Sequence, residues 1–343
     1  MSLRERIGTV AHNAVTVVLS GIQSSGRLHF GNFFGAIRQH IALQNEPGEH
    51  FYFIADYHAL TTARDPAELR DNVREVALTY LALGLDPARA VLFRQSDVPE
   101  VCELAWLLGC VAPMGLLERA HSYKDKTAKG LEANVGLFTY PVLMAADILA
   151  YDSTHVPVGK DQQQHVEMTV DMAQKWNRLF GEACLTVPKP VIPAEEHIAK
   201  VPGVDGEKMS KSYGNSIWLF EEGKALKNAV NKIVTDSRPP EEPKDPAGVL
   251  LLRFLELFLA PAEFADWQAR VRVGGTGAPG YGHLKLRLIE AIDTAFGPAR
   301  ARRRELAANP AEVERILAVG GRRARARARA TVDRCYRACG LRG

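Results

Sequence analysis

The sequence lacks any segment of the kind that directs a chain to or across a membrane. Its first fourteen residues contain Arg4, Glu5 and Arg6, and they have no apolar run of the length that a signal peptide needs. No stretch approaches the ~20 apolar residues that span a bilayer, because glycine, proline or charge interrupts each candidate. We therefore expect a cytoplasmic protein without membrane contact.

The sequence also lacks a patterned set of cysteines. There are five, an odd number, and none belongs to a CxxC pair, so neither a disulfide framework nor a tetrahedral zinc site is indicated. Cys335 and Cys339 stand one helical turn apart, a spacing that metal ligands use, but no histidine or further cysteine lies near them. We expect reduced thiols and no metal held by protein side chains.

A strong net charge is missing as well, since 43 basic residues face 40 acidic ones and leave +3. The charge is unevenly distributed, however. Residues 299–343 contain thirteen arginines and four acids, a net of +9, so the first 298 residues carry −6. This asymmetry indicates contact with a polyanion near the C-terminal end, unless these arginines simply lie on a solvated helix.

The hydrophobic pattern changes along the chain. Short β-branched or aromatic runs at 15–19, 50–55 and 90–93 are each followed by a helical pattern, which is typical of βαβ units and a parallel sheet covered by helices on both faces. Beyond a proline-rich stretch at 239–246, only helical patterns occur. We predict an α/β fold, a Rossmann-type nucleotide-binding domain with a parallel sheet followed by an all-α C-terminal domain. The expected divisions are an N-terminal extension at 1–14, the Rossmann-type domain at 15–222 and the helical domain at 223–343.

The last helical pattern includes an alternation of alanine and arginine over residues 322–329. Both residue types favour helix. Because successive helical residues are rotated by about 100°, these arginines point in nearly all directions. We therefore expect this turn not to be deeply buried.

Glycines and a histidine follow the first expected strand. Gly21, Gly26, His29, Gly31 and Asn32 lie between that strand and its helix. Glycine lets a backbone approach a ligand closely, and a helix N-terminus offers free N–H groups to phosphate. Taken alone, such a segment is often no more than a turn.

A second motif is the pentapeptide Lys208-Met209-Ser210-Lys211-Ser212, which stands about 180 residues after His29 in a loop rich in glycine and small polar residues. Two lysines three residues apart can follow the negative charge of a triphosphate as it redistributes during displacement at phosphorus. Most KxxK sequences are only exposed basic loops. The full pentapeptide after an HxGN turn is far more specific.

With both motifs present, the sequence resembles the class I aminoacyl-tRNA synthetases. Residues 29–32 are similar to the HIGH element of that family, with Asn32 in place of the final histidine, and residues 208–212 match its KMSKS element in full. The GN ending is common in the tryptophan branch. Residues 140–149 and 156–162 resemble the tryptophan-pocket helix and the VPVGxDQ segment of that branch. The similarity extends over most of residues 15–222.

The resemblance implies a reaction in two steps, ATP-dependent activation of L-tryptophan to tryptophanyl-adenylate with release of pyrophosphate, then transfer to tRNA(Trp). It also implies Mg²⁺, a homodimer and an anticodon-binding role for the helical domain. Because an α-carboxyl with a pKa of ~3.5 is already ionised, the first step needs no side-chain base. Catalysis then consists of positioning and charge stabilisation.

The family also implies the site residues. The catalytic set is His29, Lys126, Lys208 and Lys211. The ATP-binding set is Gln23, Ser24, Ser25, Gly31, Asn32, Gly159, Asp161, Lys208, Met209, Ser210, Lys211 and Ser212. The tryptophan-binding set is Gln23, His58, Tyr140, Met144, Asp147, Val156, Val158 and Gln162. Ser122 and Lys160 depart from the residues usual at their positions, glutamine and glutamate respectively.

Asp147 has a physical interpretation of its own. It interrupts an apolar helical run, and a carboxylate there is costly unless it has a donor to bind. The indole N–H of tryptophan is such a donor, and Met144, Val156 and Val158 would supply apolar walls for a flat ring. The alternative is an internal aspartate paired with the backbone or an arginine.

Three other functions remain open at this point. A tyrosyl-tRNA synthetase shares the fold and both ATP motifs, but residues 144–147 and the VPVGxDQ segment favour tryptophan. A small nucleotidyltransferase shares the His29 turn, yet has no need of the helical domain. A non-catalytic RNA-binding paralogue would not need to retain His29, Lys208, Lys211 and Asp147.

Overall fold

The computed structural model describes residues 15–24, 26–120, 123, 134–159, 162–181, 184–192 and 201–342. Five parallel strands form one sheet in the order β3-β2-β1-β4-β5. The strands are β1 (Val17–Gln23), β2 (Glu49–Ala55), β3 (Val91–Arg94), β4 (His155–Pro157) and β5 (Lys189–Val191).

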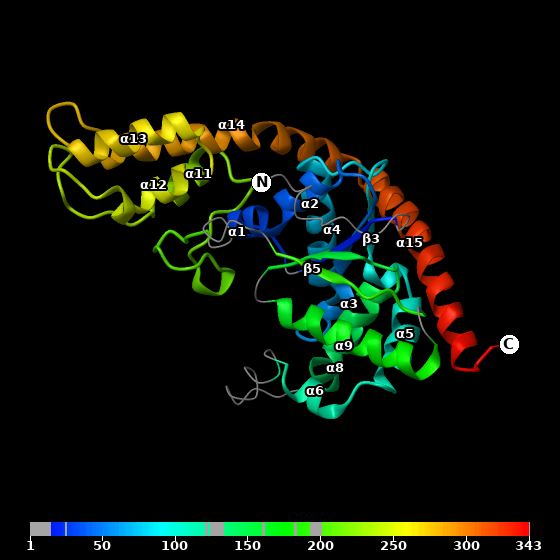
Figure 1. The fold of residues 1–343 in the computed structure, drawn as a ribbon. Coiled ribbons are helices and arrows are strands. Elements are labelled where there is room, and N and C mark those ends of the chain that lie inside the picture. Colours follow the sequence, from blue (N-terminus) through cyan, green and yellow to red (C-terminus); the bar gives the residue numbers. More distant parts are fainter. Residues whose placement is uncertain are drawn as a thin grey trace.

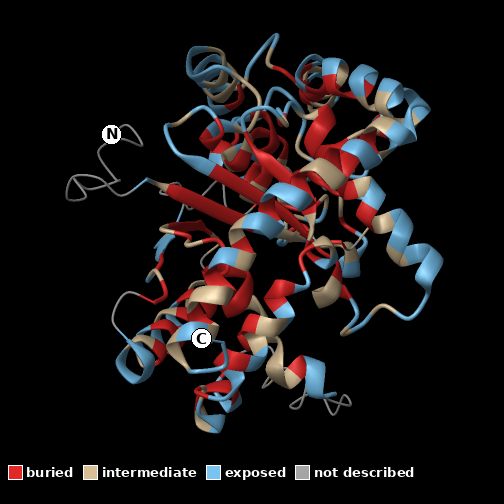
Figure 2. Cartoon of the chain, turned by 90° about the vertical axis from the view of Figure 1, so that its right-hand side faces the viewer, coloured by how far each residue is buried: buried red, intermediate tan, exposed pale blue. Residues whose placement is uncertain are grey.

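The three central runs form strands because they are apolar on both faces. Leu19, Ile54 and Phe93 are fully buried, and Leu19 lies opposite Phe51 in the register of β1 and β2. Figure 2 shows these strands as almost continuously buried, with helices on the outside that are buried on one side only. This pattern is the one expected of a parallel sheet between two helical layers. The predicted α/β fold with a parallel sheet is confirmed.

The helices of the first part alternate with the strands. They are α1 (Phe30–Asn32), continued through a π turn at Phe33–Ile37 into α2 (Arg38–Leu43), then α3 (Asp56–Ala59), α4 (Pro66–Ala82), α5 (Glu100–Gly109), α6 (Met114–Glu118), α8 (Val135–Leu149) and α9 (Gln163–Phe180). Local signals fix their starts. Asp65 accepts hydrogen bonds from the N–H groups of Ala67 and Glu68 at the start of α4, and Pro66 occupies its first position.

Beyond residue 222 the described residues form helices and loops without a strand. The helices are α11 (Gly223–Asn231), α12 (Leu250–Leu255), α13 (Pro261–Val273), α14 (Tyr281–Ala308) and α15 (Pro310–Ala338). In Figure 1, α11 to α13 and the first part of α14 form a lobe that extends away from the sheet, and α15 returns along the opposite side of the molecule. One hydrophobic cluster contains Phe30 and Phe34 together with Phe254 and Phe296, so this lobe shares a core with the first part.

α15 packs closely against β3 and α5. A Cβ built on Gly320 would lie 1.9 Å from the Leu92 carbonyl oxygen, so only glycine permits this approach. Ala324 and Ala328 are fully buried, while the arginines between them are exposed or half-buried. The expectation that this turn is not deeply buried is therefore wrong for Ala324 and Ala328, whereas it holds for the exposed Ala326. The alternation of alanine and arginine repeats every two residues, so small residues also recur every four and form a stripe along one helix face.

Among the described residues, no helix combines the length and apolar character needed to cross a bilayer.

Candidate active site

The carboxyl ends of the strands define where a ligand can bind. In the order β3-β2-β1-β4-β5, the direction of the connections changes between β1 and β4, and open parallel sheets bind ligands outside that point. Gln23 is the last residue of β1 and Ser24 follows it, and Val158 and Gly159 follow β4. The two strands are also joined by the buried Ser20 Oγ, which donates to the Pro157 carbonyl oxygen at 2.9 Å. Four of the predicted nucleotide and tryptophan residues, Gln23, Ser24, Val158 and Gly159, thus lie at the carboxyl ends of these two neighbouring strands.

The His29 turn is closed by Asn32. The His29 backbone N–H donates to Asn32 Oδ1 at 3.0 Å, and the Asn32 N–H donates to the His29 carbonyl oxygen at 2.9 Å. A Cβ built on Gly31 would lie 2.9 Å from Cε1 and Nδ1 of the His29 ring, so glycine makes room for the imidazole. Asn32, which departs from the usual HIGH ending, therefore serves as a cap of this turn.

Burial determines the charge of His29. Desolvation, and secondarily the positive charge of Lys211, lower the pKa of the His29 imidazole to about 4. Its Nδ1 is buried and has no hydrogen-bond partner among the described residues. The ring is therefore neutral at pH 7, with one nitrogen available to a ligand.

The KMSKS segment has one buried residue among exposed and half-buried ones. Met209 is buried and lies beneath Gly31, with its Cβ 3.7 Å from a Cβ built there. Lys208 is exposed and Lys211 is half-buried, and burial lowers the pKa of the Lys211 ammonium. The Ser210 and Ser212 hydroxyls form a hydrogen bond of 2.9 Å with each other. The buried methionine anchors the segment, while Lys208 and Ser212 on either side of it are exposed.

Sequence reasoning missed Asn215, which holds the KMSKS loop together. This buried amide donates to both carboxylate oxygens of Asp205, at 2.9 and 3.1 Å, and to the Lys208 carbonyl oxygen at 3.2 Å. Its Oδ1 accepts the Ser210 N–H at 2.8 Å. A Cβ on Gly203 would lie 2.2 Å from Asn215 Nδ2, so a glycine also makes room for this amide. The sequence signal that could have identified Asn215 was its place at the end of a polar loop, shortly before the apolar Ile217.

Asp147 is almost completely buried, with 1% of its surface exposed, and its carboxylate already has donors. Gln95 Nε2 lies 2.9 and 2.8 Å from its two oxygens, and His58 Nε2 lies 2.9 Å from Oδ2. Burial raises the pKa of Asp147, and the hydrogen bonds from His58 and Gln95 oppose that rise. Two carboxylate oxygens offer about four acceptor positions, so the three contacts leave room for one more donor.

Gln95 was also missed by sequence reasoning. Its Oε1 accepts the backbone N–H of Tyr57 at 3.1 Å, so its Nε2 must be the atom that faces Asp147. It directly follows β3, at the same end of the sheet as the other site residues. A polar residue at the carboxyl end of a buried strand was the signal that could have identified it.

Other predicted tryptophan-binding residues lie on α8, on β4 and directly after β4. Tyr140 lies edge-on to the His58 ring with 6.1 Å between centroids, and its hydroxyl is hydrogen-bonded to His165 Nε2. Met144 is half-buried one turn before Asp147 on α8, and Val156 is buried on β4. Val158 is half-buried after that strand. Gln162 is the N-cap residue of α9, and its N–H donates to the Gly159 carbonyl oxygen at 2.9 Å. Three predicted residues, Ser25, Lys126 and Asp161, lie outside the described residues.

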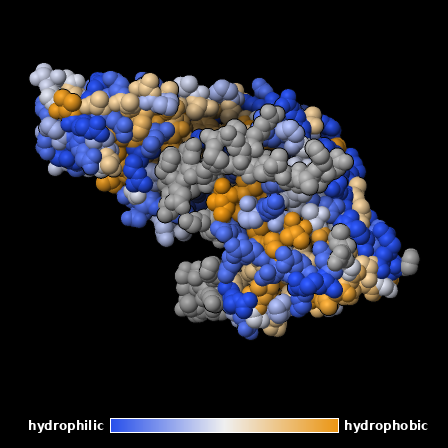
Figure 3. Space-filling view, in the orientation of Figure 1, coloured by the Kyte–Doolittle hydropathy of each residue, from blue (hydrophilic) through white to orange (hydrophobic). Residues whose placement is uncertain are grey.

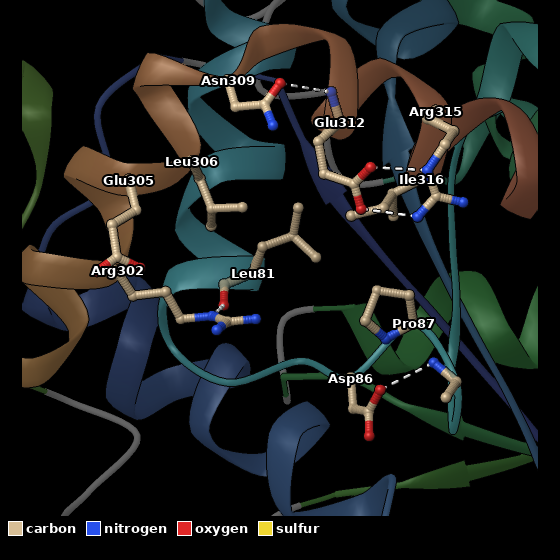
Figure 4. Close-up of a pocket in the computed structure, with 11 residues that line it drawn as sticks. Leu81, Asp86, Pro87, Arg302, Glu305, Leu306, Asn309, Glu312, Arg315 and Ile316 are labelled. Atoms are coloured by element: carbon tan, nitrogen blue, oxygen red, sulfur yellow. Dashed lines mark hydrogen bonds and ion pairs between the residues drawn. The ribbon is translucent and has the colours of Figure 1, made fainter.

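The surface in this region is mixed. In the view of Figure 3 most of the surface is hydrophilic, and apolar atoms gather in the middle of this face, below the helical lobe. A cavity of about 470 Å³ lies elsewhere, between the end of α4 and the junction of α14 and α15. Figure 4 shows Arg302 and the Glu312–Arg315 ion pair on its wall. None of the predicted site residues lines it, so it is separate from the candidate active site.

Comparison with known proteins gives consistent matches. The family described as "tRNA synthetases class I (W and Y)" matches residues 11–296. The chain is 56% identical over 325 residues to a tryptophan–tRNA ligase of Rhodopirellula baltica, covering 95% of this chain and 99% of the relative. It is 48% identical to a tryptophan–tRNA ligase of Fusobacterium nucleatum over 95% of this chain and 98% of that relative.

Solved structures agree. The tryptophanyl-tRNA synthetase of Campylobacter jejuni complexed with ADP and tryptophan is 46% identical to this chain, with a TM-score of 0.87 over 95% of this chain and 100% of that one. The tryptophanyl-tRNA synthetase of Mycoplasma pneumoniae is 30% identical, with a TM-score of 0.79 over 96% and 99% of the two chains.

Proposed function

The chain belongs to the class I tRNA synthetases of the tryptophan and tyrosine group, and from this premise we propose which of its residues bind tryptophan, ATP and tRNA. Its activity is that of a tryptophan–tRNA ligase, which forms tryptophanyl-adenylate from ATP and L-tryptophan and transfers the tryptophanyl group to tRNA(Trp). The tyrosyl alternative is thereby set aside. The main observation behind the proposed roles of the site residues is the buried Asp147 carboxylate, which lies between Gln95 and His58.

Asp147 recognises tryptophan in this proposal by accepting the indole N–H at its remaining acceptor position. Gln95 and His58 support the carboxylate form by donating to it, which offsets the cost of burial. Met144, Val156 and Val158 form the apolar walls of the pocket. The amino acid's own ammonium and carboxylate groups are assigned to Gln23, Tyr140 and Gln162, which stand at the same end of the sheet.

The nucleotide lies in this proposal between the His29 turn and the KMSKS segment. Ser24, Gly31, Asn32, Gly159 and Asp161 contact ATP, together with Ser25 and the segment Met209, Ser210 and Ser212. The neutral His29 imidazole donates to a phosphate oxygen, and Lys208, Lys211 and Lys126 stabilise charge that develops as pyrophosphate leaves. The tryptophan carboxylate is already ionised and attacks the α-phosphorus without a side-chain base.

Mg²⁺ enters as part of the nucleotide substrate. Within the described residues, no group of three or more His, Cys, Asp or Glu side chains could hold a metal ion. Mg²⁺ is commonly held by substrate phosphates with few protein ligands, so the residues present fit an ion that arrives with ATP.

The roles of Asp147 can be tested with a substrate pair. Benzothiophene-alanine keeps the ring shape of tryptophan but replaces N–H with sulfur, so it should be a poor substrate, by up to ~10⁴, because a buried acceptor is left unpaired. In Asp147→Ala, the ratio of the exchange rate with tryptophan to the exchange rate with the analogue should be smaller. The measurement is pyrophosphate exchange with both substrates on the native protein, on Asp147→Ala and on Asp171→Ala, which removes an exposed carboxylate from α9. Equal discrimination in all three proteins would remove Asp147 from tryptophan recognition.

For tRNA, we propose that residues 223–343 bind the anticodon region, with the lobe of α11 to α14 as the main contact. The lobe extends away from the sheet, as a distant anticodon requires (Figure 1). The basic helix α15 contributes only through arginines that do not already pair with acids of the protein. Arg322 and Arg323 have no ion pair among the described residues, and both are exposed.

We also propose a cytoplasmic homodimer. All five cysteines are free, as expected for a reducing compartment. Trp106 on α5 is 75% exposed, and Leu60 after α3, Met114 on α6 and Val135 on α8 are more than half exposed. The helix α8 packs against both α5 and α6. We infer that these side chains contribute to an interface, because large exposed apolar side chains that gather on one face mark one. Trp106→Glu should shift sedimentation equilibrium towards the monomer by at least tenfold in Kd, whereas Leu286→Glu on α14 should not. A monomeric native protein would contradict the proposed dimer.

A further inference from the structure

The indole ring of Trp218 lies close to residues of both nucleotide motifs, the His29 turn and the KMSKS segment. Lys211 Nζ lies 5.9 Å from the centroid of the Trp218 ring, and Arg27 Cζ lies 5.1 Å from it. The His29 ring is tilted by 56° to the indole, with 6.2 Å between centroids. Both cations are within the distance at which an aromatic face attracts positive charge.

Trp218 is fixed to the His29 turn by its backbone. The Phe30 N–H donates to the Ile217 carbonyl oxygen at 3.1 Å, and the Leu219 N–H donates to the Leu28 carbonyl oxygen at 3.1 Å. These bonds lie on either side of an antiparallel bridge between His29 and Trp218. The indole is therefore attached to the His29 turn, while Lys211 reaches it from the KMSKS loop.

The two cations differ in their exposure. Arg27 also lies 3.8 Å from the Glu221 carboxylate, and its side chain is more than half exposed. Lys211 is half-buried and faces the neutral His29 imidazole, whose low pKa results partly from this same ammonium. The aromatic face thus contacts a half-buried cation of the KMSKS segment beside the His29 ring.

We propose that Trp218 is a positioning residue that holds the Lys211 ammonium beside His29, so that both groups reach the triphosphate together. This inference rests on the proposed role of Lys211 in activation. A carboxylate at the same place would bind the lysine more strongly, but it would also repel the phosphates. An indole attracts the cation without adding negative charge, so this contact does not oppose the approach of a phosphate to Lys211.

A double-mutant cycle tests the proposal. Trp218→Leu keeps an apolar side chain but removes the aromatic face, and it should lower kcat for pyrophosphate exchange by roughly 3- to 30-fold, the range of a cation–π contact. Trp218→Phe should recover most of the rate. In a Lys211→Met background, Trp218→Leu should change the rate by less than about twofold, because the group through which it acts is gone. The dissociation constant for tryptophan should stay unchanged throughout.

Trp267 provides a matched control, since Arg270 Cζ lies 4.9 Å above its ring in α13, away from the nucleotide motifs. Trp267→Leu should leave kcat and the KM for ATP unchanged. Fluorescence supplies a second readout. ATP added without tryptophan should change the emission of the native protein and of Trp267→Phe, but not that of Trp218→Phe.

The possible failures are distinguishable. If Trp218→Leu lowers the rate equally with and without Lys211, Trp218 acts by packing or by direct contact, and the inference is overturned. An ATP-dependent emission change that persists in Trp218→Phe also overturns it. If Lys211→Met itself keeps the native exchange rate, the proposed function of Lys211 is wrong, and the inference fails with it.

Discussion

At the scale of single residues, burial controls the charge of two groups at the site. It lowers the pKa of His29 and raises that of Asp147, so both are shifted towards their neutral forms. The two groups differ in their hydrogen-bond partners. Asp147 is given donors by Gln95 and His58, whereas His29 Nδ1 is left without a partner among the described residues. A neutral imidazole beside Lys211 avoids repulsion between two cations.

The low pKa of His29 predicts a dependence of stability on pH. The unfolded chain takes up a proton on this histidine near pH 6.5, but the folded protein does so only near pH 4. The contribution to stability is therefore complete above pH 6.5 and is lost as pH falls towards 4, by on the order of 3 kcal/mol. Urea unfolding at pH 7, 5.5 and 4.5 should show a smaller loss for His29→Gln than for the native protein. The exposed His283→Gln serves as the control, and identical slopes in all three proteins would contradict the assignment.

The sequence predicted the site residues that belong to contiguous motifs and missed those that act through distant contacts. His29, Lys208 and Lys211 could be proposed because their neighbours in the sequence form a specific pattern. Gln95 could not, because its role depends on Asp147, which is 52 positions away. Trp218 was missed for the same reason, since an aromatic residue in a loop gives no sign of the cations it faces. The predicted ligand contacts themselves remain predictions.

At the scale of helices and strands, long apolar runs were predictable and short elements were not. The runs at 15–19, 50–55 and 90–93 correspond to β1, β2 and β3. β4 and β5 have three residues each, which is too few for a periodic pattern, and β5 is largely exposed. The packing of α15 depends on small residues at four-residue spacing, and the arginines between them obscured that stripe.

The contact between α15 and β3 makes a specific prediction. In Gly320→Ala the new Cβ would meet the Leu92 carbonyl oxygen at 1.9 Å, so the helix must shift and the protein should lose roughly 1–3 kcal/mol of stability. Gly282→Ala near the start of α14 is the matched control, because nothing lies within 4 Å of its new Cβ. That variant should be neutral or more stable by up to about 1 kcal/mol. Equal melting temperatures for the two variants would show that α15 is not held closely against β3.

At the scale of the whole molecule, the basic C-terminal region is mostly neutralised by the acidic remainder of the chain. Arg325 Nε lies 2.9 Å from Oε1 of the buried Glu100, and Arg329 contacts both Glu100 and Glu103. Arg327 lies 3.5 Å from Glu49 and from Asp152. The charge asymmetry seen in the sequence therefore serves, in large part, to attach α15 to the sheet.

Charge-reversal variants should distinguish the arginines that attach α15 to the rest of the protein from those that bind tRNA. Arg325→Glu places a carboxylate against Glu100, which is only 1% exposed, and should cost on the order of 2 kcal/mol of stability with tRNA affinity retained. Reversal of Arg322 and Arg323 should preserve the melting temperature, weaken tRNA binding and reduce the slope of log K against log salt by about 1–2. The measurements are thermal unfolding and filter binding at several salt concentrations. Loss of stability with unchanged tRNA affinity in the second variant would assign these arginines to packing.

The position of α15 should also protect the protein from aggregation. β3 is the outermost strand of its sheet, and such an edge exposes unpaired N–H and C=O groups that can pair with a strand of another molecule. Gly320 brings α15 against the backbone of Leu92, and residues of this helix join the hydrophobic clusters on both faces of the sheet. The helix thus occupies the place where a foreign strand would add. A chain that ends before Pro310 would present this edge to other molecules and would be prone to aggregate, even with every residue proposed to bind tryptophan or ATP in place.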